Sequence, residues 1–228
     1  IATKVLSSGA NMLELGIPFS DPLADGPTIQ ETSFIALKNG TTISTAIESV
    51  REIRTIDSES PLIFMGYFNP FLRYGFENLL MDIKLAGVDG LIVPDLPTEE
   101  SDILFGECRK QSIHLIPLLA PTSTDERIES ACKTAGGFIY CVSLTGVTGA
   151  RNRLSSGVEE LVRRIRAFTD LPVLVGFGIS SQSDVDRIGQ FANGAVVGSA
   201  FLDAVSRADF GKEVETASQF VRGLTRQG

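Results

Sequence analysis

Short apolar segments alternate with amphipathic helical segments along the whole chain, with a repeat of about 25 to 35 residues. The apolar segments are rich in Val, Ile and Phe, as is typical of strands buried on both faces in a parallel sheet. Between two of them, residues 43–53 keep apolar side chains at helical spacing for three turns. Seven strands are predicted, at Asn11–Phe19, Pro61–Tyr67, Val88–Val93, His114–Leu119, Gly137–Val142, Pro172–Gly176 and Gly194–Val197. No linker or low-complexity tract interrupts them, so the pattern predicts one α/β domain over residues 1–228.

Two architectures share this alternation, the open doubly wound sheet and the closed (β/α)8 barrel. A dinucleotide-binding open sheet favours G-x-G-x-x-G after an early strand. Here glycines follow the last two predicted strands, Gly176 and Gly178 after the first and Gly198 after the second, where barrels commonly bind phosphate. A barrel needs eight strands, and the chain starts at Ile1 inside a helix-like segment. We therefore expect a TIM barrel, N-terminally truncated, whose first strand lies ahead of Ile1.

Composition excludes several classes of function. A net charge of −8 disfavours sequence-independent binding to nucleic acid. No apolar run reaches the roughly 18 residues of a membrane span, and no signal peptide is apparent. An odd number of cysteines without metal-type spacing (Cys108, Cys132 and Cys141) predicts free thiols in a reducing compartment, the cytoplasm or the stroma of a plastid. His114, the only histidine, opens a predicted strand and is interpreted as structural, so we expect no metal site.

Glu14 is the first residue that suggests chemistry, because it lies in an otherwise apolar strand. Strand alternation places Leu13, Leu15 and Ile17 on one face and Glu14 and Gly16 on the other. In a barrel the first face packs on helices and the second points inward. An inward carboxylate is expected to have a raised pKa, which suits proton transfer. The alternative is a structural acid paired with a lysine or with backbone amides.

Further acids and glycines follow the strands. Asp25, in the proline-rich loop 18–27, is either a second functional carboxylate or a cap for the next helix. Asp95 follows another strand and is equally compatible with a structural and a functional role. The glycines of segments 176–180 and 198–200 allow backbone amides to approach an anion at a helix N-terminus, although tight turns also need glycine. Segment 146–149 is predicted to form a flap over the same place.

Together these residues resemble the tryptophan synthase alpha subunit family. The match of Leu13–Gln30, LELGIPFSDPLADGPTIQ, is highly specific, and the resemblance spans essentially the whole chain. The later segments 93–97, 146–149, 176–180 and 198–199 follow in family order. The sequence departs at its start, because the family's first strand, which contributes an aromatic side chain to the pocket, is absent. It also has Leu144 where many relatives carry arginine.

The resemblance implies retro-aldol cleavage of indole-3-glycerol phosphate to indole and glyceraldehyde 3-phosphate, with Glu14 transferring protons and Asp25 stabilising a cation. It also implies a phosphate site, an indole pocket and a flap residue that contacts Asp25. The implied phosphate ligands are Gly149, Gly178, Gly198 and Ser199; the implied pocket residues are Ile29, Ile92, Leu118, Tyr140 and Phe177; and the implied flap residue is Thr148. Neither metal nor cofactor is expected in this chain.

The resemblance further implies an alpha2beta2 complex with a beta subunit that holds pyridoxal phosphate. Pro18, Asp21, Pro22 and Asn69 would lie at that interface. Three alternatives stay open: a free-standing indole-releasing lyase, a catalytically impaired regulatory partner of the beta subunit, and another phosphate-binding barrel such as a sugar-phosphate isomerase. The last would usually need a different acid–base set at the strand ends.

Overall fold

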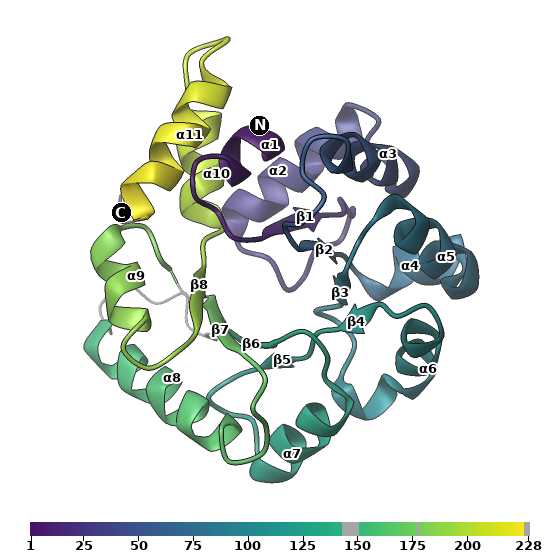
Figure 1. Ribbon diagram of the computed structural model, residues 1–228, viewed down its shortest axis with the longest axis vertical. Helices are drawn as coiled ribbons and strands as arrows, with labels where there is room; N and C mark the ends of the chain where they lie inside the picture. The colour runs from purple at the N-terminus through teal and green to yellow at the C-terminus, as the bar shows by residue number, and fades with distance from the viewer. Residues whose placement is uncertain (143–150, 177, 226–228) are drawn as a thin grey trace.

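Parallel strands form a ring with helices packed around its outside (Figure 1). The structure, a computed structural model, describes residues 1–142, 151–176 and 178–225. Its strands are β1 (Leu13–Gly16), β2 (Leu62–Met65), β3 (Gly90–Ile92), β4 (His114–Leu115), β5 (Leu118–Leu119), β6 (Ile139–Val142), β7 (Val173–Gly176) and β8 (Gly194–Val196). Its helices are α1 (Ala2–Leu6), α2 (Pro27–Lys38), α3 (Ile43–Arg54), α4 (Phe68–Tyr74), α5 (Phe76–Ala86), the 3-10 turn η1 (Thr98–Glu100), α6 (Asp102–Lys110), α7 (Asp125–Thr134), α8 (Arg151–Ile165), α9 (Gln182–Ile188), α10 (Ser199–Ser206) and α11 (Glu213–Leu224).

All strand pairs are parallel, in the orders β1-β2-β3-β4 and β5-β6-β7-β8. β4 and β5 are two parts of one predicted strand. The Ile116 amide donates to the Leu91 carbonyl (2.9 Å), and the Pro117 carbonyl accepts from the Tyr140 amide (3.1 Å). This run therefore pairs first with β3 and then with β6, and it joins the two sheets. Each of the seven predicted segments contains a strand, and the prediction of an α/β fold with parallel strands is confirmed.

Apolar side chains fill both sides of the ring. One cluster packs β1–β4 against the first helices, and a second packs β5–β8 against α7, α8 and α9. A third, the interior cluster, lies inside the ring and comprises Met12, Ile63, Met65, Ile92, Ile116, Leu118, Phe138, Tyr140 and Leu174. The alternation predicted for β1 is confirmed, because Leu13, Leu15 and Ile17 belong to the outer cluster while Met12 belongs to the interior cluster.

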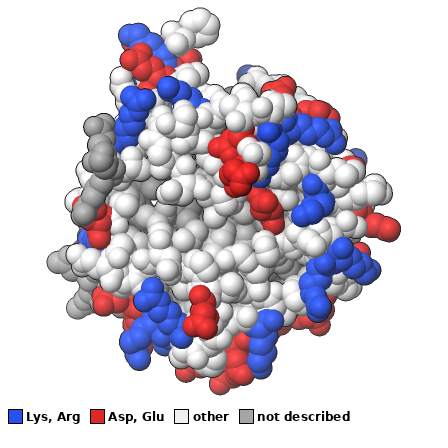
Figure 2. All heavy atoms as spheres, viewed as in Figure 1, with Lys and Arg blue, Asp and Glu red and all other residues white. Residues whose placement is uncertain are grey.

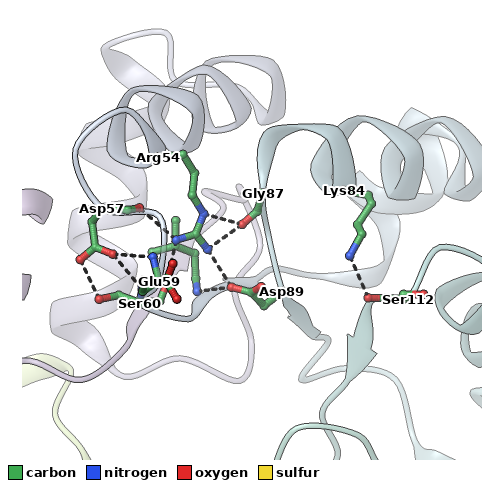
Figure 3. Close-up of polar contacts among 9 residues, drawn as sticks. Arg54, Asp57, Glu59, Ser60, Lys84, Gly87, Asp89 and Ser112 are labelled. Atoms are coloured by element: carbon green, nitrogen blue, oxygen red, sulfur yellow. Dashed lines mark hydrogen bonds and ion pairs between the residues drawn. The ribbon is translucent and has the colours of Figure 1, made fainter.

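Arg54 ties together the chain segments that lead into β2 and β3 (Figure 3). Its guanidinium donates to the carbonyl oxygens of Gly87 (2.7 and 2.9 Å) and Ser60 (2.7 Å), and it pairs with the Asp89 carboxylate at 2.8 Å. The same Asp89 oxygen accepts from the Leu62 amide, the first of β2, at 2.8 Å. This network lies at the amino ends of the strands, where a barrel's residues serve stability.

None of the helices in the described ranges is long and apolar enough to cross a membrane.

Candidate active site

Glu14 lies on the inward face of β1. It is level with Ile63 of β2, a member of the interior cluster. Its side chain is accessible to solvent, although protein atoms surround most of it. Among the described residues, no hydrogen bond reaches its carboxylate, so the lysine or amide partner of the structural alternative is not found there.

The pKa of Glu14 is raised from 4.5 to about 7. The main cause is burial among protein atoms, which disfavours the charged form, and the negative charge of Asp25 adds to it. Near neutral pH the carboxyl group is present in both protonation states, which a group that both donates and accepts a proton requires.

Asp25 points to Tyr67 and does not cap the following helix. The N-cap of α2 is Gly26, and no side chain caps it. The Asp25 carboxylate instead accepts a hydrogen bond from the Tyr67 hydroxyl, at 3.0 Å. The helix-cap interpretation of Asp25 is therefore wrong. Partial burial raises the pKa of Asp25, and the bond from Tyr67 works in the opposite direction.

Tyr67, which the sequence analysis did not single out, fixes the loop that carries Asp25. The residue is 5% exposed, and its hydroxyl also accepts from the Ala24 amide at 2.9 Å. Its ring lies 5.3 Å from that of Phe19. Ser33 of α2 holds the other end of the loop, since its hydroxyl accepts from the Phe19 amide at 2.9 Å. The loop is thus tied to two neighbouring elements.

The interior cluster supplies an apolar floor beside the two carboxylates. Ile92, Leu118 and Tyr140, three of the expected pocket residues, belong to it. The Tyr140 ring crosses Gly176, where a Cβ would come within 2.7 Å of its Cε1 atom. Ile29, a fourth, lies beside Gly198, since a Cβ there would be 3.9 Å from the Ile29 Cδ1 atom. The fifth, Phe177, is outside the described residues.

Two helix N-termini follow the last strands, and they differ in what satisfies their amides. At α9 the chain supplies its own anion, because the Asp184 carboxylate accepts from the Ser180 and Ser181 amides, both at 3.2 Å. At α10 the N-cap is Gly198, with no side-chain cap. The first amides of a helix have no acceptor within it, so those of Ser199 and Ala200 are suited to an external anion. The next amide, that of Phe201, already donates to the Gly198 carbonyl at 3.0 Å.

Of the other expected phosphate and flap residues, the structure describes only Gly178. Gly178 precedes α9 with φ +44°, a left-handed conformation that glycine tolerates well. Gly149 and Thr148 lie outside the described residues, as does Leu144.

The four expected interface residues come from two neighbouring segments. Pro18, Asp21 and Pro22 belong to the loop after β1, and Asn69 lies in the first turn of α4. Asp21 and Asn69 are exposed. Leu23, in the same loop, is 93% exposed, which is unusual for a large apolar side chain. Tyr67 joins the two segments through its bond to the Ala24 amide.

Charge is distributed unevenly over the face in Figure 2. Basic and acidic side chains lie mostly toward its rim, while the hollowed middle is largely uncharged, with a group of acidic side chains beside it. In the part of the chain that the structure describes, no three His, Cys, Asp or Glu side chains group as metal ligands would. The site thus combines two carboxylates, a tyrosine hydroxyl, an apolar floor and a helix N-terminus without a side-chain cap.

Comparison with known proteins decides the family. Residues 1–226 match the family model described as tryptophan synthase alpha chain. The chain belongs to the tryptophan synthase alpha chain family. It has the function of a tryptophan synthase alpha chain, a lyase of tryptophan biosynthesis, and the expectation from the sequence is confirmed.

Individual relatives agree. The tryptophan synthase alpha chain of Roseiflexus sp. (strain RS-1) is 49% identical over 98% of this chain and 86% of its own length. The tryptophan synthase of Saccharomyces cerevisiae is 41% identical over 95% of this chain, which spans 31% of that protein.

Solved structures of tryptophan synthase alpha chains share the fold. The subunit from Legionella pneumophila superposes with a TM-score of 0.90 at 33% identity, over 98% of this chain and 83% of that one. A chain of the a2b2 complex from Pyrococcus furiosus gives 0.89 at 39% identity, over 96% of this chain and 88% of that one. These matches confirm the TIM-barrel prediction.

Proposed function

We propose that this chain cleaves indole-3-glycerol phosphate to indole and glyceraldehyde 3-phosphate, with Glu14 as the proton-transferring group and Asp25 as the group that stabilises positive charge. The observation that carries the proposal is the pairing of an inward carboxyl group of pKa about 7 with a second carboxylate held by Tyr67. Beside this pair lies an apolar floor that suits indole. The α10 N-terminus, preceded by glycine, suits a phosphate.

The chemistry follows from the two protonation states of Glu14. The protonated carboxyl group donates to indole C3, which places positive charge on the ring nitrogen, where Asp25 stabilises it. The bond from C3 to the glycerol carbon then breaks, and its electron pair restores the aromatic ring. The hydroxyl on that carbon loses its proton to Glu14 as it becomes the aldehyde. One proton is given and one is taken, so Glu14 returns to its starting state.

Asp25→Asn tests the electrostatic half of this proposal. A neutral amide cannot stabilise a developing cation, and loss of one such group typically costs about 10²–10³ in rate. We expect indole formation to fall by at least about a hundredfold. Because Asp25 contributes to the raised pKa of Glu14, any residual pH–rate profile is expected to shift toward lower pH. A variant with normal turnover and only a lower melting temperature would make Asp25 a structural residue.

For the partner, we propose a beta subunit that binds pyridoxal phosphate and docks on Pro18, Asp21, Pro22 and Asn69. The Pyrococcus furiosus homologue is described as a mutually activating a2b2 complex. Support in this chain comes from the exposed side chains of Asp21 and Leu23 in the loop after β1 and of Asn69 in the first turn of α4. Tyr67 joins these two segments. A displacement of either segment therefore changes the position of Asp25.

We expect the isolated chain to be a poor catalyst and a matching beta subunit to raise cleavage at least about tenfold, through better placement of Asp25 and exclusion of water. Asp21→Ala is expected to reduce this activation more than basal cleavage. The measurement is indole formation against beta-subunit concentration for both proteins. Full unassisted activity would favour a free-standing lyase, whereas activation of serine-dependent beta chemistry without any cleavage would favour a regulatory partner.

A further inference from the structure

Asp95 lies in the loop after β3, and the proposed reaction gives it no role. Its side chain is exposed, yet its carboxylate accepts a hydrogen bond from the Phe68 amide at 2.8 Å. Phe68 is the first residue of α4, and Tyr67, the N-cap of that helix, offers no side-chain cap. Asp95 therefore caps α4 from the neighbouring loop, and negative charge at this end of a helix is favourable.

This cap is one of two bonds that bracket Tyr67. On the other side, the Gly66 amide donates to the Ile92 carbonyl at 3.0 Å. Both acceptors belong to the segment of β3 and its loop, so the backbone of Tyr67 is held between two points of one neighbouring element. The backbone bond at Gly66 is independent of side chains. The bond at Phe68 depends entirely on Asp95.

Close packing around Gly66 and α4 limits how far the Tyr67 side chain can move. A Cβ on Gly66 would come within 2.5 Å of Phe71 in α4 and 3.0 Å of Ile17 in the outer cluster, and Phe71 is fully buried. The start of α4 thus sets where the Tyr67 ring emerges. From there the hydroxyl reaches Asp25 at 3.0 Å and the Ala24 amide at 2.9 Å.

We propose that Asp95 is a positioning residue for catalysis, which fixes Asp25 by capping α4 and so orienting Tyr67. The proposal rests on the function proposed above. The contacts join the segments that follow three neighbouring strands: Asp95 follows β3, Tyr67 follows β2 and Asp25 follows β1. A displacement of about 1 Å at a reacting group can cost as much as 10² in rate, so the effect of Asp95 on turnover is measurable.

A double-mutant cycle tests whether Asp95 acts on Asp25 through Tyr67. We expect Asp95→Ala and Tyr67→Phe each to lower kcat for indole formation roughly tenfold, with KM changed less than about threefold. Because both act through the same bond to Asp25, the double variant is expected to be no worse than Tyr67→Phe alone, within about twofold. Asp95→Asn keeps an acceptor oxygen and is expected to recover most of the lost kcat.

The pH–rate profile separates this role from a general loss of stability, which does not change the pKa of Asp25. The bond from Tyr67 lowers the pKa of Asp25, so its loss raises that pKa. Glu14 and Tyr67 are the other titratable groups coupled to this carboxylate. The acid limb of kcat/KM is therefore expected to shift to higher pH by the same amount in Asp95→Ala and in Tyr67→Phe.

Glu99→Ala is the matched control, since it removes a charge from the same segment but breaks only an exposed pair with Arg127. Its kcat and pH profile are expected to match those of the wild type.

If Asp95→Ala does not fold, Asp95→Glu displaces the acceptor and carries the same expectations. The role of Asp95 would be overturned if the losses of kcat multiplied in the double variant, or if the acid limb of kcat/KM did not shift. Absence of cleavage by the wild type, with or without a beta subunit, would instead overturn the proposed function.

Discussion

Glu14→Gln is expected to lower the rate of indole formation by about 10²–10⁴, the usual loss when a general acid–base group is removed. Glutamine keeps the shape of the side chain but cannot pass a proton between the indole carbon and the glycerol hydroxyl. The measurement is steady-state cleavage, with a pH profile for each protein. The wild-type profile is expected to have an inflection near pH 7, which the variant lacks.

Binding provides the control for this variant. Neither the apolar floor nor the α10 N-terminus includes Glu14, so affinity for a non-cleavable phosphate analogue of the substrate is expected to stay within about threefold. Near-normal turnover would remove Glu14 from the mechanism. Loss of both binding and turnover would point to a collapsed pocket and would leave Glu14 with a structural role.

The same variant is expected to change how stability depends on pH. The folded chain keeps the Glu14 proton up to about pH 7, whereas the unfolded chain releases it near 4.5. The folded state therefore binds more protons between these values, and its stability falls as pH rises through that window. Glu14→Gln removes this dependence. We expect its melting temperature to exceed that of the wild type above pH 7, and the difference to vanish below pH 4.5.

Arg54→Met is expected to destabilise the fold by about 3 kcal/mol, because it leaves a group of carbonyls and the Asp89 carboxylate without their shared donor. The Arg54 side chain is only 17% exposed. For a chain of this size the melting temperature should fall by about 6–12 °C. Turnover per folded molecule is expected to be unchanged, since the network lies at the strand ends opposite the loops that carry Asp25 and Tyr67.

Lys84→Met is the matched control in the same region (Figure 3). Among the described residues, Lys84 makes one exposed hydrogen bond, to the Ser112 carbonyl at 3.3 Å. Its loss is expected to change stability by less than about 0.5 kcal/mol. Equal effects of the two substitutions on thermal unfolding would show that the Arg54 network contributes no more than an ordinary surface contact.

The sequence allowed the fold and the position of Glu14 to be predicted, because both depend on local patterns. Seven apolar runs give the parallel strands, and a period of two places Glu14 opposite Leu13 and Leu15. The split of the run 114–119 into β4 and β5 was not predicted. It depends on which neighbour each residue pairs with, and that is settled only when the ring assembles.

Tyr67 and the cap from Asp95 could not be found in the same way. Tyr67 lies 42 positions from Asp25 along the chain, and its position at the end of an apolar strand is typical of a core residue. Asp95 lies 27 positions from Phe68. Both contacts join loops of different strands, so no periodicity records them. The glycine before α10, Gly198, was predicted, but the contrast with α9, whose first amides are bound by Asp184, depends on where that side chain points.

The separate apolar clusters behind β1–β4 and behind β5–β8 give bound substrate a way to affect stability. These two clusters share no residue, and a smaller one packs α1 against α10 and α11. The interior cluster contains residues from both β1–β4 and β5–β8. If indole binds against Ile92, Leu118 and Tyr140 as proposed, it contacts strands of each half. Its binding free energy then opposes separation of the two halves, as any ligand favours the state that binds it. Under the proposed function, substrate therefore stabilises the junction between β4 and β5.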